Sequence, residues 1–247
     1  MPKASARAAP TCSVDQIAYE PARSGTPVTP DLISVAARYA TMARDSGAVR
    51  SHVDELFDAL HHADDSRLRV AALGALLRGG NQTTRRRAWR AGAAASERDV
   101  RLRAAELTLH LAAPAPSVLV QLMSDPDELV ADAACFAAGE VIWPDAQRAR
   151  IVRALTTAAS HTDPLVRESA VAALGAIGDP AGLPAILAGC TDRPTVRRRA
   201  VLALAPFDGP EVEAALQAAL TDSDWQTRQA AEDLVNSSVS ESGADPA

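Results

Sequence analysis

The sequence predicts an all-α protein built from stacked pairs of helices, and three observations carry this prediction. Apolar residues recur at steps of three and four along most of the chain, which is the periodicity of one helix face. A short pattern returns at a nearly constant interval, as in stacked repeat arrays. An alanine stands at the same place in every copy of the pattern. Together these features are typical of a helical repeat protein.

The clearest copy is the stretch 163–180, with the sequence DPLVRESAVAALGAIGDP. Asp163 is a favourable N-cap, and Pro164 suits the first helical position, where its missing N–H is not needed. The apolar residues that follow lie on one face of the predicted helix. Gly178 is expected to end this helix just before the next Asp-Pro pair begins another.

Six copies align on a residue that is apolar in most copies and is usually followed by arginine. The anchors are Leu68, Val100, Val130, Val166, Val196 and Thr227. Their spacings are 32, 30, 36, 30 and 31 residues, which two helices of about 12 residues and two short loops would fill. The alanines four residues after the anchors are Ala72, Ala104, Ala134, Ala170, Ala200 and Ala231. A methyl group there lets neighbouring helices approach closely, whereas a larger side chain would push the stack apart.

A charged pattern accompanies the anchors. Most copies carry an acid three residues before the anchor and an arginine directly after it. We interpret these residues as helix caps and as ion pairs between successive repeats. A charged strip that binds a ligand is the alternative, although a binding residue need not recur in every unit. The residues to which we assign the structural role are Asp65, Arg69, Arg101, Asp163, Arg167, Arg197 and Arg228.

The pattern D-P-x-V-R-x-x-A-x-x-A-L-G, read at 163–175, resembles the HEAT repeat in the short form found in phycobilisome lyase subunits. The resemblance extends over roughly 31–235. It implies a right-handed α-solenoid of about six to seven antiparallel helix pairs. It also implies that the second helix of each pair lines the concave surface.

The periodicity assigns one solenoid to residues 31–236, between a flexible tail at 1–30 and a disordered end at 237–247. The first tail is rich in proline, and the second is small and polar. Divergent terminal repeats are expected because one side of each meets water. The expected helices are 31–44, 49–62, 66–77, 83–95, 99–111, 117–123, 128–140, 145–160, 164–177, 181–188, 195–204, 210–220 and 224–235.

The composition limits the class of protein. The net charge of −6 argues against a general nucleic-acid binder, which is usually basic. We expect no membrane span, because no run of 18 apolar residues occurs. Residues 1–30 lack the apolar core of a signal peptide. Cys12, Cys135 and Cys190 are widely spaced and are expected to be reduced thiols of a cytoplasmic protein.

The sequence RRRAWR at 85–90 is the main candidate binding segment. The resemblance places its helix on the concave side, where arginines with a tryptophan can hold a phosphate, an acidic peptide or a nucleic-acid strand. Consecutive helical residues point about 100° apart, so only Arg86 with Arg90, and Arg87 with Arg90, share a face. A solvated helix face is the alternative. Trp89 is expected in the core or at its edge.

Charge is distributed unevenly along the array. The region 31–110 carries 13 arginines against 10 acids, whereas 125–235 carries 9 arginines against 17 acids. Such a bipolar solenoid suits a partner of opposite polarity or head-to-tail stacking of copies, and a merely solvated surface is the alternative. The candidate partner-binding residues are Arg86, Arg87, Arg90, Arg148, Arg150, Asp54, Glu55 and Asp58.

The sequence offers little for catalysis. None of the five histidines belongs to a His-x-x-x-His or His-Glu pair, whereas the iron-binding hydroxylases among HEAT-repeat proteins carry His-Glu pairs. No phosphate-binding glycine loop and no nucleophile–base set can be identified. We therefore predict a protein without catalytic residues, metal or cofactor.

The leading hypothesis is a scaffold or adaptor that binds another protein on its concave face and has no membrane partner. A nucleic-acid-binding or DNA-repair protein is one alternative, because HEAT-like DNA alkylation glycosylases use a basic concave face. The acidic total weighs against it. The repeat subtype suggests another alternative, a lyase or maturation subunit that handles a tetrapyrrole, although a shared fold says little about function.

Overall fold

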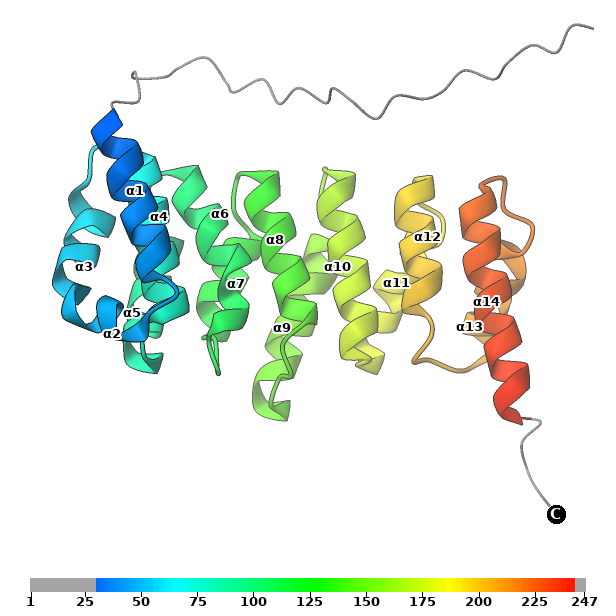
Figure 1. Cartoon of the computed structure of the whole chain (residues 1–247). Coiled ribbons are helices and arrows are strands. Elements are labelled where there is room, and N and C mark those ends of the chain that lie inside the picture. Colours follow the sequence, from blue (N-terminus) through cyan, green and yellow to red (C-terminus); the bar gives the residue numbers. More distant parts are fainter. Residues whose placement is uncertain (1–29, 243–247) are drawn as a thin grey trace, which may run out of the picture.

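The computed structural model describes residues 30–242, in which all regular elements are helical (Figure 1). The predicted all-α fold is confirmed. Most of the predicted tail at 1–30 and the last five residues of the predicted disordered end lie outside the described residues. The described chain contains fourteen α-helices and two 3-10 helices, η1 and η2. No helix in it is long and apolar enough to cross a membrane.

The helices follow one another along the array in chain order. The first half contains α1 (Pro30–Met42), α2 (Ser46–Ser51), α3 (Val53–His62), α4 (Ser66–Gly79), α5 (Gln82–Ala93), α6 (Arg98–Glu106), η1 (Thr108–His110) and α7 (Pro116–Met123). The second half contains α8 (Glu128–Gly139), α9 (Asp145–Ala158), α10 (Pro164–Ile177), η2 (Pro180–Gly182), α11 (Leu183–Gly189), α12 (Pro194–Ala203), α13 (Pro210–Ala219) and α14 (Trp225–Ser242).

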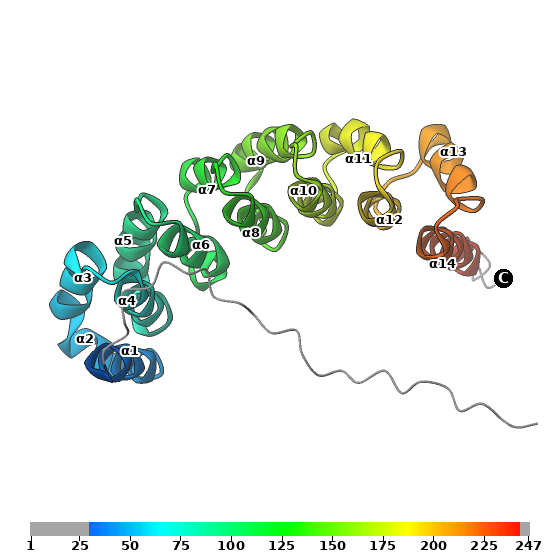
Figure 2. The same cartoon turned by 90° about the horizontal axis from the view of Figure 1, so that it is seen from above.

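Seen from above, the array is an arc of two layers (Figure 2). The even-numbered helices from α4 to α14 form the inner, concave layer, and the odd-numbered helices from α3 to α13 form the outer, convex layer. Inner helices pack directly against one another, most extensively α8 against α10 and α10 against α12. The concave surface is therefore built from the helices that carry the anchors.

This arrangement corrects one expectation. We expected the second helix of each predicted pair to line the concave surface, but α5, α7, α9, α11 and α13 lie on the convex side (Figure 2). The predicted pairs were out of phase by one helix. Helix α7 packs more extensively against α8 than against α6, and α9 packs more extensively against α10 than against α8. At α7 and α9 the anchor helix is thus the second member of its pair, whereas α5 and α11 pack about equally against both neighbouring anchor helices.

Several predicted boundaries also differ from the structure, including that of the helix expected over 181–188, which is divided into η2 and α11. The helix expected over 49–62 is divided at His52, where α2 ends and α3 begins. The helix expected over 99–111 ends at Glu106 and continues as η1. The disordered end expected from residue 237 is wrong for 237–242, because α14 extends to Ser242.

Small residues set the spacing between inner helices. The six alanines four residues after the anchors are fully buried, as predicted for close packing. Glycines bring later turns of the same helices together. A Cβ atom on Gly175 would lie 2.6 Å from Ala203 Cα, and one on Gly139 would lie 2.8 Å from Ala173 Cα. Gly178 ends α10 in the left-handed conformation with φ 65°, as its position in the sequence predicted.

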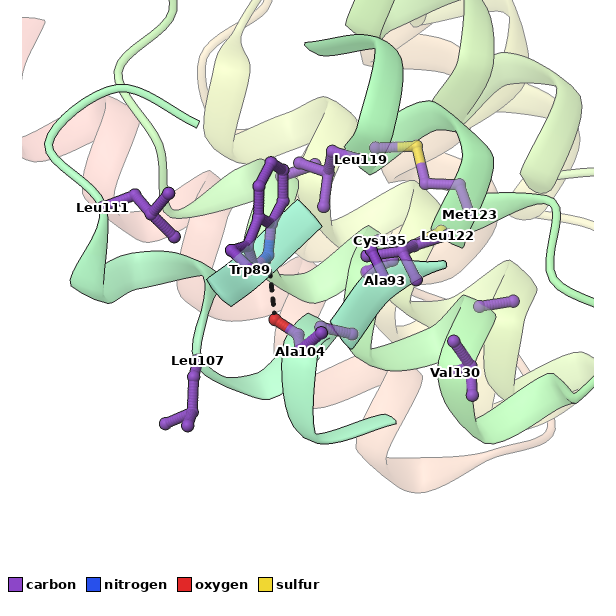
Figure 3. Packing of buried hydrophobic residues seen from close by; sticks show 14 of the residues in the cluster. Trp89, Ala93, Ala104, Leu107, Leu111, Leu119, Leu122, Met123, Val130 and Cys135 are labelled. Atoms are coloured by element: carbon purple, nitrogen blue, oxygen red, sulfur yellow. Dashed lines mark hydrogen bonds between the residues drawn. The ribbon is translucent and has the colours of Figure 1, made fainter. Parts of the chain in front are cut away.

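Trp89 anchors the outer helix α5 to the core (Figure 3). Its side chain is buried. Its indole N–H donates to the carbonyl oxygen of Ala104 at 3.0 Å and to Thr108 Oγ1 at 3.2 Å. A buried tryptophan needs such an acceptor. The prediction of a core position is confirmed, and the aromatic residue of RRRAWR is therefore not part of a binding surface.

We expect Gly175→Ala to lower the free energy of unfolding by about 1–3 kcal/mol, because the added methyl group collides with the backbone of α12. Gly74→Ala is the matched control. Its added Cβ would meet only ordinary contacts of 3.8 Å or more, and the better helix propensity of alanine should stabilise α4 by up to about 1 kcal/mol. Chemical denaturation measures both variants, and equal stability of the two would contradict the close approach.

Candidate binding surfaces

The three candidate arginines of the RRRAWR segment lie on the convex layer. Arg86, Arg87 and Arg90 are exposed on α5. Arg87 is already engaged, since its guanidinium carbon lies 4.0 Å from the ring centroid of Phe57 on α3. Arg86 Nε is only 3.4 Å from the carbonyl oxygen of Gln82 one turn earlier. The cluster is therefore a convex surface feature, and the concave position implied by the resemblance is wrong.

The other candidates are also on outer helices. Arg148 pairs with Asp145 at 2.9 Å on the first turn of α9, and Arg150 is exposed on the same helix. Asp54 and Asp58 are exposed on α3. Helix α7 separates α5 from α9 (Figure 2). The structure thus does not bring the predicted arginines together in one site.

Glu55 has a structural role. Its carboxylate forms an ion pair with Arg38 and accepts a hydrogen bond from the Tyr39 hydroxyl at 3.2 Å. Both partners belong to α1, which lies beside α4 at the end of the array (Figure 2). Glu55 therefore ties the first helix to α3, and it is not a free acidic contact.

Arginines next to the anchors form the predicted ladder between repeats. The inter-repeat pairs are Arg69–Glu97 (2.9 Å), Arg101–Asp125 (2.7 and 3.0 Å), Arg167–Asp192 (2.6 and 2.7 Å) and Arg197–Asp222 (2.8 and 2.6 Å). The last three are two-pronged pairs, which fix both distance and orientation. Each arginine also donates to a carbonyl of the loop before its own helix. One guanidinium thus joins two successive loops.

The acid three residues before the anchor has a different role in most copies. Asp65 and Asp163 cap their helices by accepting from the backbone N–H of Arg67 and Leu165. Only Glu97 both occupies this position and receives the arginine of the previous repeat. The two functions that we expected of one acid are divided between two residues in the other copies.

Apart from Glu97, the acids that pair with these arginines lie four or five residues before the next anchor. Asp125 and Asp222 are the two that sequence reasoning missed, although an Asp recurs at this place in the chain. The hydrogen bond from Arg197 holds the pKa of Asp222 below its usual value, and the Arg167 guanidinium does the same for Asp192. These carboxylates are therefore charged elements of the fold.

The ladder is interrupted between α8 and α10. Ala131 stands where other repeats carry the arginine after the anchor. His161 stands where the next loop of other repeats carries the acid. The His161 ring nitrogen Nδ1 accepts from the backbone N–H of Asp163 at 3.0 Å, which is what a ladder aspartate does elsewhere. Instead, the Ser169 hydroxyl donates to Asp132 and joins α10 to α8. Both members of the usual pair are thus replaced together.

A groove of about 590 Å³ opens on the concave side of α1, α4, α6 and the start of α8. Its floor contains Val70, Ala71, Gly74 and Leu102. Its charged lining is formed by Arg67, Arg78, Arg98, Asp99, Arg103 and Glu106. Arg98 pairs with Asp99 and Asp127, and Arg103 pairs with Glu106 at 2.7 Å. Within residues 30–242, the exposed guanidinium of Arg78 has no ion pair.

Phe136 stands in the middle of the concave surface. Its side chain is 59% exposed on α8, and hollows of about 330 and 260 Å³ lie on its two sides, toward α6 and toward α12. Leu109 and Ala133 line the first hollow, and Ala172 and Ala176 line the second. An exposed phenylalanine between apolar hollows is a feature of surfaces that bind a partner.

The described residues offer little redox or metal chemistry. No group of three His, Cys, Asp or Glu side chains suited to a metal occurs among residues 30–242. Burial raises the pKa of Cys135 to about 12 and that of Cys190 to about 11, so both remain protonated thiols at neutral pH. Cys12 lies outside the described residues. Cys135 is buried in the hydrophobic core, and the half-buried Cys190 packs against that core.

Two family models match the chain. HEAT repeats match residues 116–205, and the PBS lyase HEAT-like repeat matches residues 196–222. These matches confirm the HEAT-repeat resemblance that was read from 163–175. A comparison with curated protein sequences gives no match.

Solved structures share the solenoid fold. The Escherichia coli protein YibA aligns with a TM-score of 0.58 at 17% identity, over 85% of this chain and 80% of YibA. An engineered protein aligns with a TM-score of 0.52 at 21% identity, over 84% of this chain and 67% of the engineered chain. At these identities the likeness concerns the fold alone.

We expect Asp222→Asn to lower the free energy of unfolding at pH 7 by about 1.5–3 kcal/mol, since it breaks a charged hydrogen bond. The pKa of Asp222 is lowered in the folded state from its usual 3.8. The Asp222 carboxylate therefore stabilises the fold fully above its usual pKa of 3.8. This stabilisation is lost as the pH falls through the lower pKa of the folded state. Denaturation curves between pH 7 and pH 2.5 should show the two proteins converging below about pH 4. Asp208→Asn, an exposed acid between α12 and α13, is the control, and a difference that persists in acid would refute the ion-pair assignment.

The interruption of the ladder can be repaired by design. We expect Ala131→Arg and His161→Asp together to form the missing pair, whereas each alone leaves a half-buried charge without its partner. A double-mutant cycle of unfolding free energies should give a favourable coupling of about 1–3 kcal/mol. The pair Ala131→Arg with His161→Asn is the uncharged control. Additive effects of the two changes would show that the loops before α8 and α10 are not spaced like those of the other repeats.

Proposed function

We propose that this HEAT-repeat protein is a non-catalytic interaction module that binds a segment of another protein on the concave face of its solenoid. The observation that carries the proposal is the exposed Phe136 between two hollows on the inner helices. Leaving an aromatic side chain in water is unfavourable, and a partner that covers it recovers the hydrophobic contribution. Interaction sites commonly have such a central aromatic residue with lined pockets around it.

The hollows form a series along the array, which favours an extended or helical segment as the partner. The groove at α1, α4 and α6 is followed by the hollow between α6, α8 and α10 and then by the one between α8, α10 and α12. Leu129 lines the first groove and is 40% exposed at the start of α8. A segment lying across several inner helices would contact apolar side chains at each step.

The charges of the first groove indicate the chemistry of that segment. Four arginines and two acids line it, and Arg78 is the guanidinium left without an ion pair among the described side chains. A carboxylate on the partner would supply Arg78 with an ion pair and a charge-assisted hydrogen bond. We therefore propose a segment with an acidic residue for this groove and an apolar residue for the hollows around Phe136.

The alternatives from the sequence receive less support. A nucleic-acid interface needs a stripe of basic groups that are free to contact phosphates, whereas Arg98 and Arg103 of the concave groove already pair with acids. The match to a PBS lyase HEAT-like repeat covers 27 residues of one repeat region, 196–222, and describes an architecture rather than an activity. The absence of catalysis and the cytoplasmic location remain part of our proposal.

A photo-crosslinking amino acid in place of Phe136 tests the proposal in cells. We expect it to capture a discrete protein, and the affinity of that purified protein should fall by at least about tenfold with Phe136→Ala. Ile142 is the matched control, because it is 97% exposed but lies in the turn after α8. A crosslinker or an alanine there should have no effect.

A further control separates the two faces of the solenoid. Arg86→Glu with Arg90→Glu reverses charge on the convex helix α5 and should leave the affinity for the captured protein unchanged. If the convex variant abolishes binding while Phe136→Ala does not, the concave interface is wrong and the arginine cluster is the binding surface.

A further inference from the structure

A second pocket lies at the edge of the solenoid, where α2, the end of α4 and the start of α5 meet. Its volume is about 430 Å³, which is within the range of small-molecule sites. The lining residues are Ser46, Val49, Arg50, Val53, Arg78, Gly79, Gly80, Asn81, Thr84 and Arg85. Three of them are arginines from three different helices, and none is acidic. This pocket is thus more strongly basic than the concave groove.

No carboxylate within residues 30–242 forms an ion pair with the three arginines. Arg50 and Arg78 are exposed and have no ion pair within the described part of the chain. Arg85 is held in place, since it donates to the carbonyl oxygens of His110 at 3.0 Å and Arg78 at 2.8 Å. Its buried Nε has no hydrogen-bond partner among residues 30–242. By contrast, Arg69 pairs with an acid, as the other arginines of the ladder do.

The titration of a neighbouring histidine reports the same excess of positive charge. Burial lowers the pKa of His110, and the charges of Arg78, Arg85 and Arg103 lower it further. Arg78 and Arg85 are the two pocket arginines on α4 and α5. The two guanidinium groups thus make the surroundings of the pocket positive, which favours an anion there.

Close backbone packing brings the arginines of α2 and α4 together. A Cβ atom on Gly79 would lie 2.5 Å from Val49 Cγ2, and one on Gly80 would lie 2.3 Å from the carbonyl oxygen of Leu76. Only a glycine at position 79 therefore allows Val49 of α2 to lie so close to the end of α4, whereas Gly80 makes its close contacts within the turn from α4 to α5. Gly79 and Gly80, which end α4 and lead into α5, thus also shape the pocket.

We propose that this pocket binds a small phosphate monoester, with the phosphate group between Arg50, Arg78 and Arg85. Guanidinium groups suit phosphate because their N–H donors match its oxygens in pairs. The hydroxyls of Ser46 and Thr84 supply further donors at the lining. The volume exceeds what the phosphate alone needs, and the side chains of the two valines can contact the carbon part of the ester. The site shares Arg78 with the edge of the concave groove, whereas Arg50 and Arg85 line this pocket alone.

Isothermal titration calorimetry with the full-length protein tests the site, with inorganic phosphate and glycerol 3-phosphate as probes at constant ionic strength. We expect saturable binding of both, with the ester at least as tight as the free ion. Arg50→Gln should weaken both affinities by at least about tenfold, the loss expected for one charged hydrogen bond. Arg50 lies in this pocket and outside the concave groove, so its substitution leaves that groove unchanged.

Arg86→Gln is the matched control, because it removes the same charge from an exposed position of α5 that does not line the pocket. It should leave both affinities within about twofold, as expected for a screened surface charge. The site is wrong if the wild-type protein shows no saturable binding, or if Arg50→Gln and Arg86→Gln weaken it equally. Binding of inorganic phosphate without binding of glycerol 3-phosphate would overturn the assignment to an ester.

Discussion

The rest of the solenoid depends on the arginine clamp, which is one ion pair of the ladder together with the hydrogen bonds from the same arginine to the loop before its own helix. A helix pair of this size cannot bury its apolar faces alone, so its stability comes from its neighbours. The clamp fixes how neighbours meet, because one guanidinium donates both to the loop before its own helix and to an aspartate of the next loop. In the pairs of Arg167 and Arg197, both prongs are shorter than 2.9 Å. Such geometry specifies orientation as well as distance.

Close packing of the inner helices determines what the concave surface can present. The buried alanines and glycines bring α8, α10 and α12 near one another, so each helix contributes only a narrow strip to the surface. Phe136, Leu165 and Leu202 lie on these strips and remain exposed. The residues that hold the array together and the residues that face a partner are therefore on the same helices, separated by less than one turn. A repeat can consequently change its binding residues while its contacts with neighbouring repeats are retained.

The repeat architecture could be predicted from the sequence because its causes are local and periodic. Asp163 and Gly178 mark the ends of α10 by their own backbone preferences, and the recurring alanine indicates a packed helix face. The phase of the pairs could not be predicted in this way. The apolar periodicity does not indicate which neighbour of an anchor helix is its partner, and the three-dimensional packing is needed to show it.

The same limit explains why the arginines of RRRAWR were placed on the concave face. The arginines of RRRAWR are adjacent in sequence and therefore conspicuous, but they diverge around α5 on the convex layer. The pocket arginines Arg50, Arg78 and Arg85 are far apart in sequence and come from three helices. Likewise, Phe136 is one apolar residue among many until the fold shows that it faces outward. A site assembled from several repeats leaves no local pattern to find.

The interruption of the ladder occurs at the helix that carries Phe136. With Ala131 and His161 in place of the usual pair, the loops before α8 and α10 lack the clamp that joins other repeats. The polar contact between these helices is instead the hydrogen bond from Ser169 to Asp132, whose residues line the hollow beside Phe136. Burial raises the pKa of Asp132, so a partner that fills this hollow and removes more water favours its neutral form further. At this one step of the array, the residues that join two repeats also line the hollow where we propose that a partner binds. The packing of α8 against α10 is therefore the part of the solenoid that binding can affect most directly.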